Sequence, residues 1–205
     1  MKGKLPITVA ILLGGESKRF GSSKAFLDWK GRSLAAHLAE TSVPLAAEVL
    51  LVGKSEEQIP PDTKALARLV IDAPGFPGPL AGLAAALSNA SNPWIFLTGV
   101  DMPYLNGKTL EEFWKLREKS VLLGAVVPHV DGKWQPLCAL WNKYALKLLE
   151  GAPWRSFQYF LNESGLKVLK VEESALRSWD PELLCLKGFN DEESLNELKD
   201  NPDVP

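Results

Sequence analysis

The chain has 205 residues, 46% of them hydrophobic, with 23 lysines and arginines against 25 aspartates and glutamates and a formal charge of −2. A chain of this length can bury a core without a metal or disulfide staple, and its composition argues against disorder. The balanced charge gives no sign of a basic surface stripe that would bind nucleic acid. The sequence also contains no run of about 18 apolar residues, the length that a membrane-spanning helix needs.

We therefore expect one domain over residues 1–205, with a frayed tail at about 200–205 and no nucleic-acid or membrane partner. The apolar run at 7–13 is short, and Gly14, Gly15 and Glu16 follow it where a signal peptide would carry a small-residue cleavage site. A cytoplasmic location is therefore expected. Cys138 and Cys185 have no metal-binding spacing, which predicts two buried thiols.

Apolar runs predict strands and amphipathic patterns predict helices in alternation along the chain. The expected strands are 7–13, 48–53, 68–72, 94–99, 121–128, 133–141 (interrupted by Pro136) and 166–171. The expected helices are 34–41, 80–87, 109–119, 143–150, 157–162 and 190–199. Alternating strands and helices predict an α/β fold with a mostly parallel twisted sheet flanked by helices. In such a fold, ligands bind at the carboxyl ends of the strands.

A glycine-rich segment, LLGGESKRFGSSK over residues 12–24, directly follows the first expected strand. Glycines let backbone N–H groups approach phosphate oxygens closely, and the lysines and arginine supply neutralising charge. The segment fits neither GxxxxGK[ST] nor GxGxxG, so it is not one of the usual phosphate fingerprints. The residues alone leave two interpretations open, a phosphate-binding loop and a surface loop with solvated charges.

Two aspartates stand at strand ends: Asp72 closes the third expected strand and Asp101 lies just past the fourth. Mg²⁺ takes a few carboxylate ligands and completes its shell with water and substrate phosphates. Either aspartate would suit a metal-bound nucleotide facing the glycine segment. Turn formation or helix capping is the alternative for both.

The order and spacing of these segments resemble the MobA-like nucleotidyltransferases over nearly the whole chain. The first segment is similar to the family signature L-A-G-G-x-S-x-R-M-G-x-x-K, with Leu13 in place of alanine and Phe20 in place of methionine. Further elements of the family are matched in order by Asp72 and by residues 77–82, 99–104, 135–141 and 189–193.

The resemblance implies a single Rossmann-like domain that transfers GMP from GTP to molybdenum-molybdopterin and releases pyrophosphate, with Mg²⁺ as the cofactor. The glycine at 15 and the PLAG element at 79–82 are similar to the guanylyl-transferring branch rather than the cytidylyl-transferring one. The implied partners are GTP, molybdopterin, and proteins of molybdenum cofactor biosynthesis and molybdoenzyme maturation.

The resemblance also assigns roles to individual residues. Nucleotide binding falls to Leu12, Leu13, Gly14, Gly15, Lys24, Asp72 and Asp101. Among these, Lys24, with Arg19, would balance phosphate charge in catalysis, Asp101 would hold the metal, and Asp72 would accept hydrogen bonds from the nucleoside. Because Leu13 is larger than the usual alanine, we expect it to narrow the space near the base. Pterin binding would fall to Gly78, Gly82 and Asn190, together with Arg155, which stands at an expected helix start where an anion could bind.

Several alternatives stay open at this level. Gly78 and Gly82 would serve equally as helix-packing glycines, and Asn190 as a helix N-cap. A related transferase with another base or a sugar-phosphate acceptor would keep the first segment and Asp101. A nucleotide-binding protein without turnover would keep both Lys24 and Asp101 as ligand contacts alone.

Overall fold

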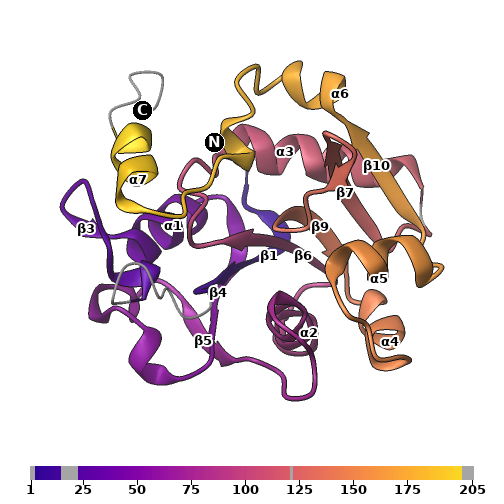
Figure 1. Cartoon of the computed structure of the whole chain (residues 1–205), viewed down its shortest axis with the longest axis horizontal. Helices are drawn as coiled ribbons and strands as arrows, with labels where there is room; N and C mark the ends of the chain where they lie inside the picture. Colours follow the sequence, from indigo (N-terminus) through magenta and orange to yellow (C-terminus); the bar gives the residue numbers. More distant parts are fainter. Residues whose placement is uncertain (1–2, 15–22, 121, 200–205) are drawn as a thin grey trace.

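The computed structural model describes residues 3–14, 23–120 and 122–199. Strands from both halves of the chain join in one eight-stranded sheet, in the order β10-β7-β9-β6-β1-β4-β5 with β8 paired to β7 (Figure 1). The strands are β1 (Leu5–Leu12), β4 (Ala46–Gly53), β5 (Arg68–Ile71), β6 (Trp94–Gly99), β7 (Ala125–Val130), β8 (Lys133–Trp134), β9 (Cys138–Asn142) and β10 (Val168–Glu172). A separate two-stranded sheet pairs β2 (Asp28–Trp29) with β3 (Arg32–Ser33). The expected mixed α/β class is confirmed.

The sheet is parallel except at β9 and at β8, which runs antiparallel to β7. β1 pairs in parallel with β4 and β6, β4 with β5, and β7 with β10. β9 runs antiparallel to both β6 and β7. The expected interruption of the strand over 133–141 at Pro136 is confirmed, because residues 135–137 turn between β8 and the reversed β9.

β1 is buried on both faces because helices cover the sheet on both sides. Successive side chains of a strand point to opposite faces, and Val9 and Ile11 accordingly pack in one apolar cluster while Ala10 and Leu12 pack in another. The first cluster contains side chains of α1 (Leu34–Ser42), α3 (Gly107–Leu116) and α6 (Glu173–Arg177). The second contains those of α2 (Pro79–Asn89), α4 (Ala145–Glu150) and α5 (Phe157–Glu163).

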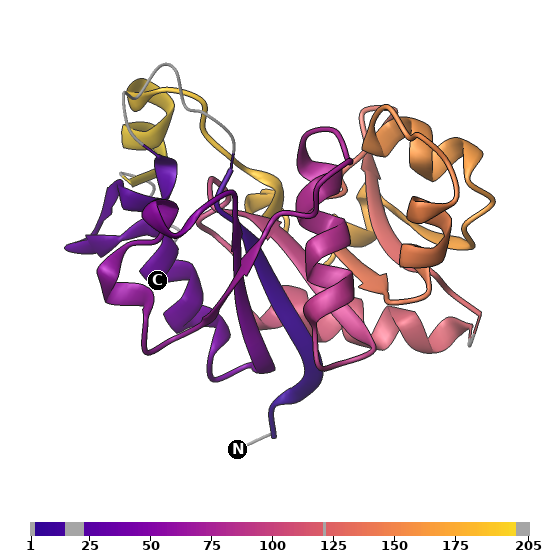
Figure 2. The same ribbon diagram turned by 90° about the horizontal axis from the view of Figure 1, so that it is seen from below.

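The last helix, α7 (Glu192–Lys199), returns the chain to the side of its N-terminal half (Figures 1 and 2). The Tyr104 hydroxyl donates a hydrogen bond to the Leu198 carbonyl and fixes this return. The expected helix began two residues earlier, with Asn190 as its cap. In the structure Asp191 caps it instead, because its Oδ1 accepts the Ser194 N–H at 2.9 Å.

Two further expectations concern the whole chain. Both cysteines lie within the described residues and are free and buried, as expected. In the part of the chain that the structure describes, no helix combines the length and apolar character needed to cross a membrane.

Candidate functional site

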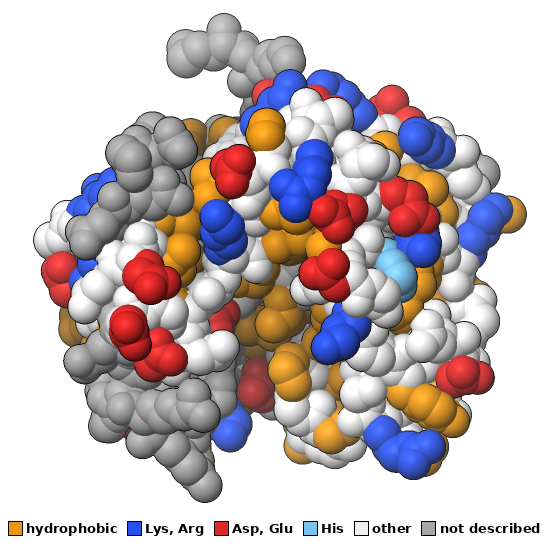
Figure 3. Space-filling view, turned by 45° about the horizontal axis from the view of Figure 1, so that its top comes forward, with side chains coloured by type: hydrophobic (Ala, Val, Ile, Leu, Met, Phe, Trp, Pro, Cys, Tyr) orange, Lys and Arg blue, Asp and Glu red, His pale blue; other side chains and the backbone are white. Residues whose placement is uncertain are grey.

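A cavity of about 1080 Å³ lies at the carboxyl ends of β1, β4, β5 and β6, next to the first turn of α2. Figure 3 shows the surface hollowed near the centre of one face, with charged side chains around the hollow. The sequence predicted the ligand site at this edge of the sheet. The strands that form it come from the first half of the chain, and Leu137 and Asn190 add lining from the second half.

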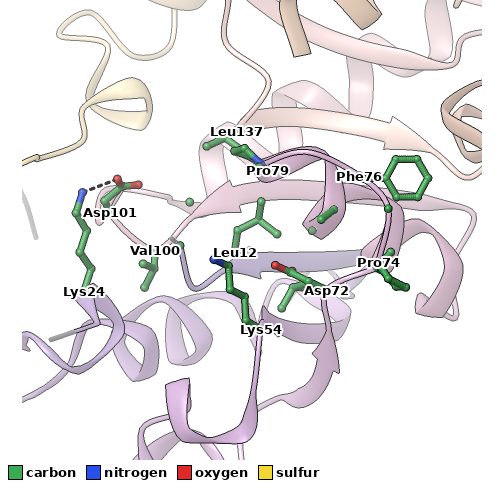
Figure 4. Close-up of a pocket in the computed structure, with 18 of the residues that line it drawn as sticks. Leu12, Lys24, Lys54, Asp72, Pro74, Phe76, Pro79, Val100, Asp101 and Leu137 are labelled. Carbon is green, nitrogen blue, oxygen red and sulfur yellow. Dashed lines mark hydrogen bonds and ion pairs between the residues drawn. The ribbon is translucent and has the colours of Figure 1, made fainter. Parts of the chain in front are cut away.

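At one end of the cavity, Lys24 and Asp101 form an ion pair with 2.9 Å between Nζ and Oδ2 (Figure 4). Lys24 opens a single 3-10 turn, Lys24–Phe26, that Ser23 caps and that buries Ala25 in the core. The Lys24 ammonium also donates to the Phe189 carbonyl at 2.5 Å and lies 4.9 Å from the centre of the Phe189 ring. Three segments far apart in the sequence thus meet at one cation.

Asp101 reaches this position because the strand before it ends in glycine. A Cβ on Gly99 would lie 2.6 Å from Oδ1 of Asp101, closer than real Cβ contacts allow. Gly99 is thus the close-approach position that lets the carboxylate fold back over the end of β6. The Asp101 side chain keeps 33% of its surface exposed and lines the cavity.

Gly14 lines the cavity between the two charged ends, with a φ of +89° that favours glycine. Leu12, two residues earlier, lines it as well. The expectation that Leu13 narrows the space near the base is wrong. Its side chain is buried in the cluster on the opposite face of the sheet, and its N–H donates to the Val52 carbonyl at 2.8 Å. Leu13 therefore does not narrow the cavity.

Lys54 and Asp72 stand side by side at the other end of the cavity (Figure 4). Val52 of β4 pairs with Val70 of β5, and the Asp72 N–H continues the ladder to the Gly53 carbonyl at 2.9 Å. Continuing this register places Lys54 opposite Asp72, and the period of two aims both side chains to the face that Val52 and Val70 share. Burial raises the pKa of Asp72, and the positive charge of Lys54 opposes that rise.

An apolar wall completes the cavity. It consists of side chains from Leu12, Val52, Phe76 and Leu137. Apolar walls with a few convergent polar groups are typical of small-molecule sites. Sequence reasoning missed Lys54, Phe76, Leu137 and the Phe189 carbonyl. For Lys54 a signal was present, because it directly follows a buried strand at the same edge as Asp72.

The candidate pterin residues divide into two groups. Gly78, Gly82 and Asn190 line the cavity. Gly82 also has a packing reason, since a Cβ there would lie 2.7 Å from Cδ2 of Leu12. Arg155 is not among the described residues that line the cavity, and its guanidinium lies over the Tyr159 ring, 4.9 Å from the centroid. Gly15 and Arg19 lie outside the described residues.

The arrangement can hold an anion and an aromatic group in one cavity. Within the described residues, no cluster of three or more His, Cys, Asp or Glu side chains could hold a metal alone. Asp101 supplies one accessible carboxylate, which fits Mg²⁺ only if substrate phosphates and water supply the other ligands, as this ion commonly requires.

The chain is similar to known proteins in both sequence and fold. A family model described as the MobA-like NTP transferase domain matches residues 9–166. The chain is 33% identical to a molybdenum cofactor guanylyltransferase of Pseudomonas putida over 94% of this chain and 97% of that protein. Among solved structures, molybdopterin-guanine dinucleotide biosynthesis protein A of Archaeoglobus fulgidus is similar with a TM-score of 0.76 and 26% identity, over 94% of this chain and 96% of that chain.

A cytidylyl-transferring enzyme has a similar fold. The 2-C-methyl-D-erythritol 4-phosphate cytidylyltransferase of Thermus thermophilus superposes with a TM-score of 0.62 and 17% identity, over 93% of this chain and 96% of that chain. At this identity the likeness concerns the fold alone. Base choice must therefore come from the residues of the cavity.

Proposed function

This chain belongs to the MobA-like NTP transferase family, and from that premise we propose that it transfers GMP from GTP to molybdenum-molybdopterin. An oxygen of the terminal phosphate of the pterin attacks the α-phosphorus of GTP. The bond from that phosphorus to the oxygen bridging the β-phosphate breaks, and pyrophosphate leaves with the electron pair. The attacking phosphate is already ionised at neutral pH, so the step needs no general base.

The observation that carries the proposal is the Lys24–Asp101 pair at one end of a cavity of about 1080 Å³. A positioned cation stabilises charge that develops on transferred and leaving phosphates. The Lys24 ammonium is held by Asp101 and by the Phe189 carbonyl, so it needs little reorganisation to face the phosphates. Arg19 is proposed as a second cation for the leaving pyrophosphate.

Asp101 would also hold Mg²⁺, which supplies charge neutralisation and orientation of the phosphates when bound. The nucleotide would lie along residues 12–15, with its nucleoside toward Asp72. Gly14, with its positive φ, would let the phosphates approach the backbone closely.

For the pterin we propose the cavity face formed by Gly78, Gly82 and Asn190. Arg155 remains a proposal for the outer part of the pterin only, since its guanidinium lies over Tyr159. We also propose a cytoplasmic location, where GTP is available, and contact with proteins that make the cofactor or receive it.

Pyrophosphate release by the purified protein tests the function. The reaction would contain Mg²⁺ and molybdenum-molybdopterin, with GTP, CTP or ATP in parallel. We expect release with GTP alone, and loss of release without Mg²⁺ or in Asp101→Ala. Release with CTP would move the protein to cytidylyl transfer. GTP binding without release under any of these conditions would refute the transferase function.

A further inference from the structure

Lys54 is a cavity residue that the proposed reaction leaves unused. It is the first residue after β4 and is exposed at the cavity. Among the described residues, no carboxylate lies within ion-pair distance of its ammonium, although the charge of Lys54 is felt at Asp72. Figure 4 shows both side chains reaching into the same part of the cavity. A free donor and a partly buried acceptor thus stand next to each other.

The position of this pair separates it from the reacting end of the cavity. β5, β4, β1 and β6 are successive neighbours in the sheet. Neighbouring strands lie about 4.8 Å apart, so β5 and β6 are separated by roughly 14 Å and β4 and β6 by roughly 10 Å. If the phosphates occupy the Lys24–Asp101 end, Lys54 and Asp72 meet the nucleoside. This step rests on the proposed function.

The chemistry of the pair matches one base better than the others. A lysine ammonium only donates hydrogen bonds, and an ionised carboxylate only accepts them. Guanine carries two adjacent donors, N1–H and the N2 amino group, on the edge that also presents the O6 acceptor, with N7 as a further acceptor. Adenine and cytosine each present one exocyclic amino donor next to an acceptor ring nitrogen on the corresponding edge. A carboxylate can therefore take two hydrogen bonds from guanine and one from either competitor.

We propose that Lys54 is a specificity-determining residue that donates to O6 of guanine, an acceptor that adenine lacks, while Asp72 accepts from N1–H and the N2 amino group. Lys54 then recognises an acceptor of the base, and Asp72 recognises two donors of the same base. The apolar Val52 side chain beneath them excludes water from the base, which makes each hydrogen bond count more.

Equilibrium binding to Lys54→Met tests the proposal, because methionine keeps an unbranched stem and removes the donor. GTP, ATP and ITP, which lacks the N2 amino group, would each be titrated with Mg²⁺ into the wild type and the variant. We expect GTP and ITP affinity to fall about ten- to hundredfold and ATP affinity to stay within twofold. The ratio of GTP to ITP affinity should not change, because the N2 contact belongs to Asp72.

Two control variants accompany this measurement. Lys64→Met removes another exposed lysine, one that is not among the described residues lining the cavity, and should bind all three nucleotides like the wild type. Lys54→Arg keeps a donor and should recover most of the GTP preference. Thermal unfolding of every variant checks that the fold is intact.

The outcomes separate the inference from the proposed function. Equal weakening of GTP and ATP in Lys54→Met would mean that Lys54 contacts phosphates, and no weakening would mean that it is a solvated lysine. Either result overturns the inference and leaves guanylyl transfer standing. A wild type with no preference for GTP, or with no pyrophosphate release, would instead refute the proposed function itself.

Discussion

The neighbouring strands β4 and β5 carry a pair of opposite charges at each end, and the two pairs are treated differently. At the amino ends, Glu48 and Arg68 form an ion pair with 2.8 Å between Oε1 and the guanidinium. At the carboxyl ends, Lys54 and Asp72 face each other across the same register, and among the described residues no ion pair joins them. Opposite charges on the same two strands thus form a closed pair, Glu48–Arg68, that is joined by an ion pair, and an open pair, Lys54–Asp72, that is not.

The closed pair has further hydrogen-bond partners within the protein. Glu48 also accepts hydrogen bonds from the Thr8 hydroxyl and from the N–H and hydroxyl of Ser91, while Arg68 donates to the Asn89 carbonyl. A satisfied network of this kind fixes the packing of the strands and loops that it joins. The open pair borders a cavity, where a ligand can supply the missing partners. The difference favours the carboxyl edge as the functional end, on physical grounds that do not depend on relatives.

Removing the cation at the open end should have the largest effect. We expect Lys24→Ala to lower kcat for pyrophosphate release by about 10²–10³-fold, because a preorganised charge at the phosphates is lost. Thermal unfolding should change little, since the Asp101 side chain left behind is one-third exposed. Lys64→Ala is the matched control outside the cavity. Near-normal turnover by Lys24→Ala would show that Lys24 does not act on the phosphates.

Moving the carboxylate without deleting it should have the next largest effect. In Gly99→Ala the new methyl group would lie 2.6 Å from Oδ1 of Asp101, so the carboxylate must shift. We expect activity to fall about 10- to 100-fold, because small displacements of catalytic groups are costly.

The control for this substitution is Gly151→Ala, where the added Cβ meets its nearest atoms at 3.4 and 3.5 Å. It should leave activity unchanged. Steady-state kinetics with thermal unfolding distinguishes the two effects. If Gly99→Ala retained full activity, Asp101 would not require its observed position.

The sequence predicted much of this site because its signals are local. A buried apolar run ends visibly, so Asp72 and Asp101 were expected at one edge of the sheet, where the structure places them. The alternation of side chains along a strand also predicts the orientation of Leu13. Its side chain lies with that of Ile11 on the core face, whereas the side chain of Leu12 faces the cavity.

The remaining features depend on contacts distant in sequence. The Lys24–Phe189 contact joins residues 165 positions apart and uses a backbone carbonyl, which every residue type has. The reversed direction of β9 has no signature in a short apolar run, because strands of either direction bury the same side chains. Asn190 and Asp191 are both residue types that favour the N-cap position, so the sequence does not show which of them caps the helix. The structure decides for Asp191, because the helix begins at the next residue.

Removing the charge of Glu48 in the closed pair should lower the stability of the fold without changing turnover. We expect Glu48→Gln to reduce the free energy of unfolding by about 1–2 kcal/mol, because charge-assisted hydrogen bonds to Arg68 and Ser91 are weakened. Turnover by the folded protein should not change. Urea unfolding at neutral pH, with kinetics below the transition, measures both. A stable variant with impaired turnover would reverse the roles of the two ends.

The same substitution has a pH signature. Partial burial would raise the pKa of Glu48, but hydrogen bonds from Arg68, Ser91 and Thr8 outweigh it and hold the pKa below its ordinary value. The stabilisation is therefore complete above the ordinary glutamate pKa and is lost as pH falls through the lowered one. We expect the stability difference between wild type and Glu48→Gln to shrink over that acidic range.

Neutralising Asp72 of the open pair should raise stability, whereas Glu48→Gln lowers it. The change in the free energy of unfolding should be the smallest of those predicted here. Burial raises the pKa of Asp72, so the folded protein holds this proton more tightly than the unfolded chain does. Wild-type stability then decreases as pH rises from the ordinary aspartate pKa through the raised one. At neutral pH, Asp72→Asn should be more stable than the wild type by about 0.5 kcal/mol or less, since the half-exposed carboxylate is screened by solvent.

The gain in stability should come with a loss of binding. Asp72→Asn replaces an acceptor of two hydrogen bonds by an amide, so GTP affinity should fall while the protein becomes more resistant to unfolding at neutral pH. The stability difference should vanish below the ordinary aspartate pKa, where both chains carry a neutral group. Asp28→Asn, at an exposed position on β2, should show neither effect. A destabilised Asp72→Asn at neutral pH would place Asp72 among the closed, structural charges such as Glu48, and would remove the distinction between the two ends of β4 and β5.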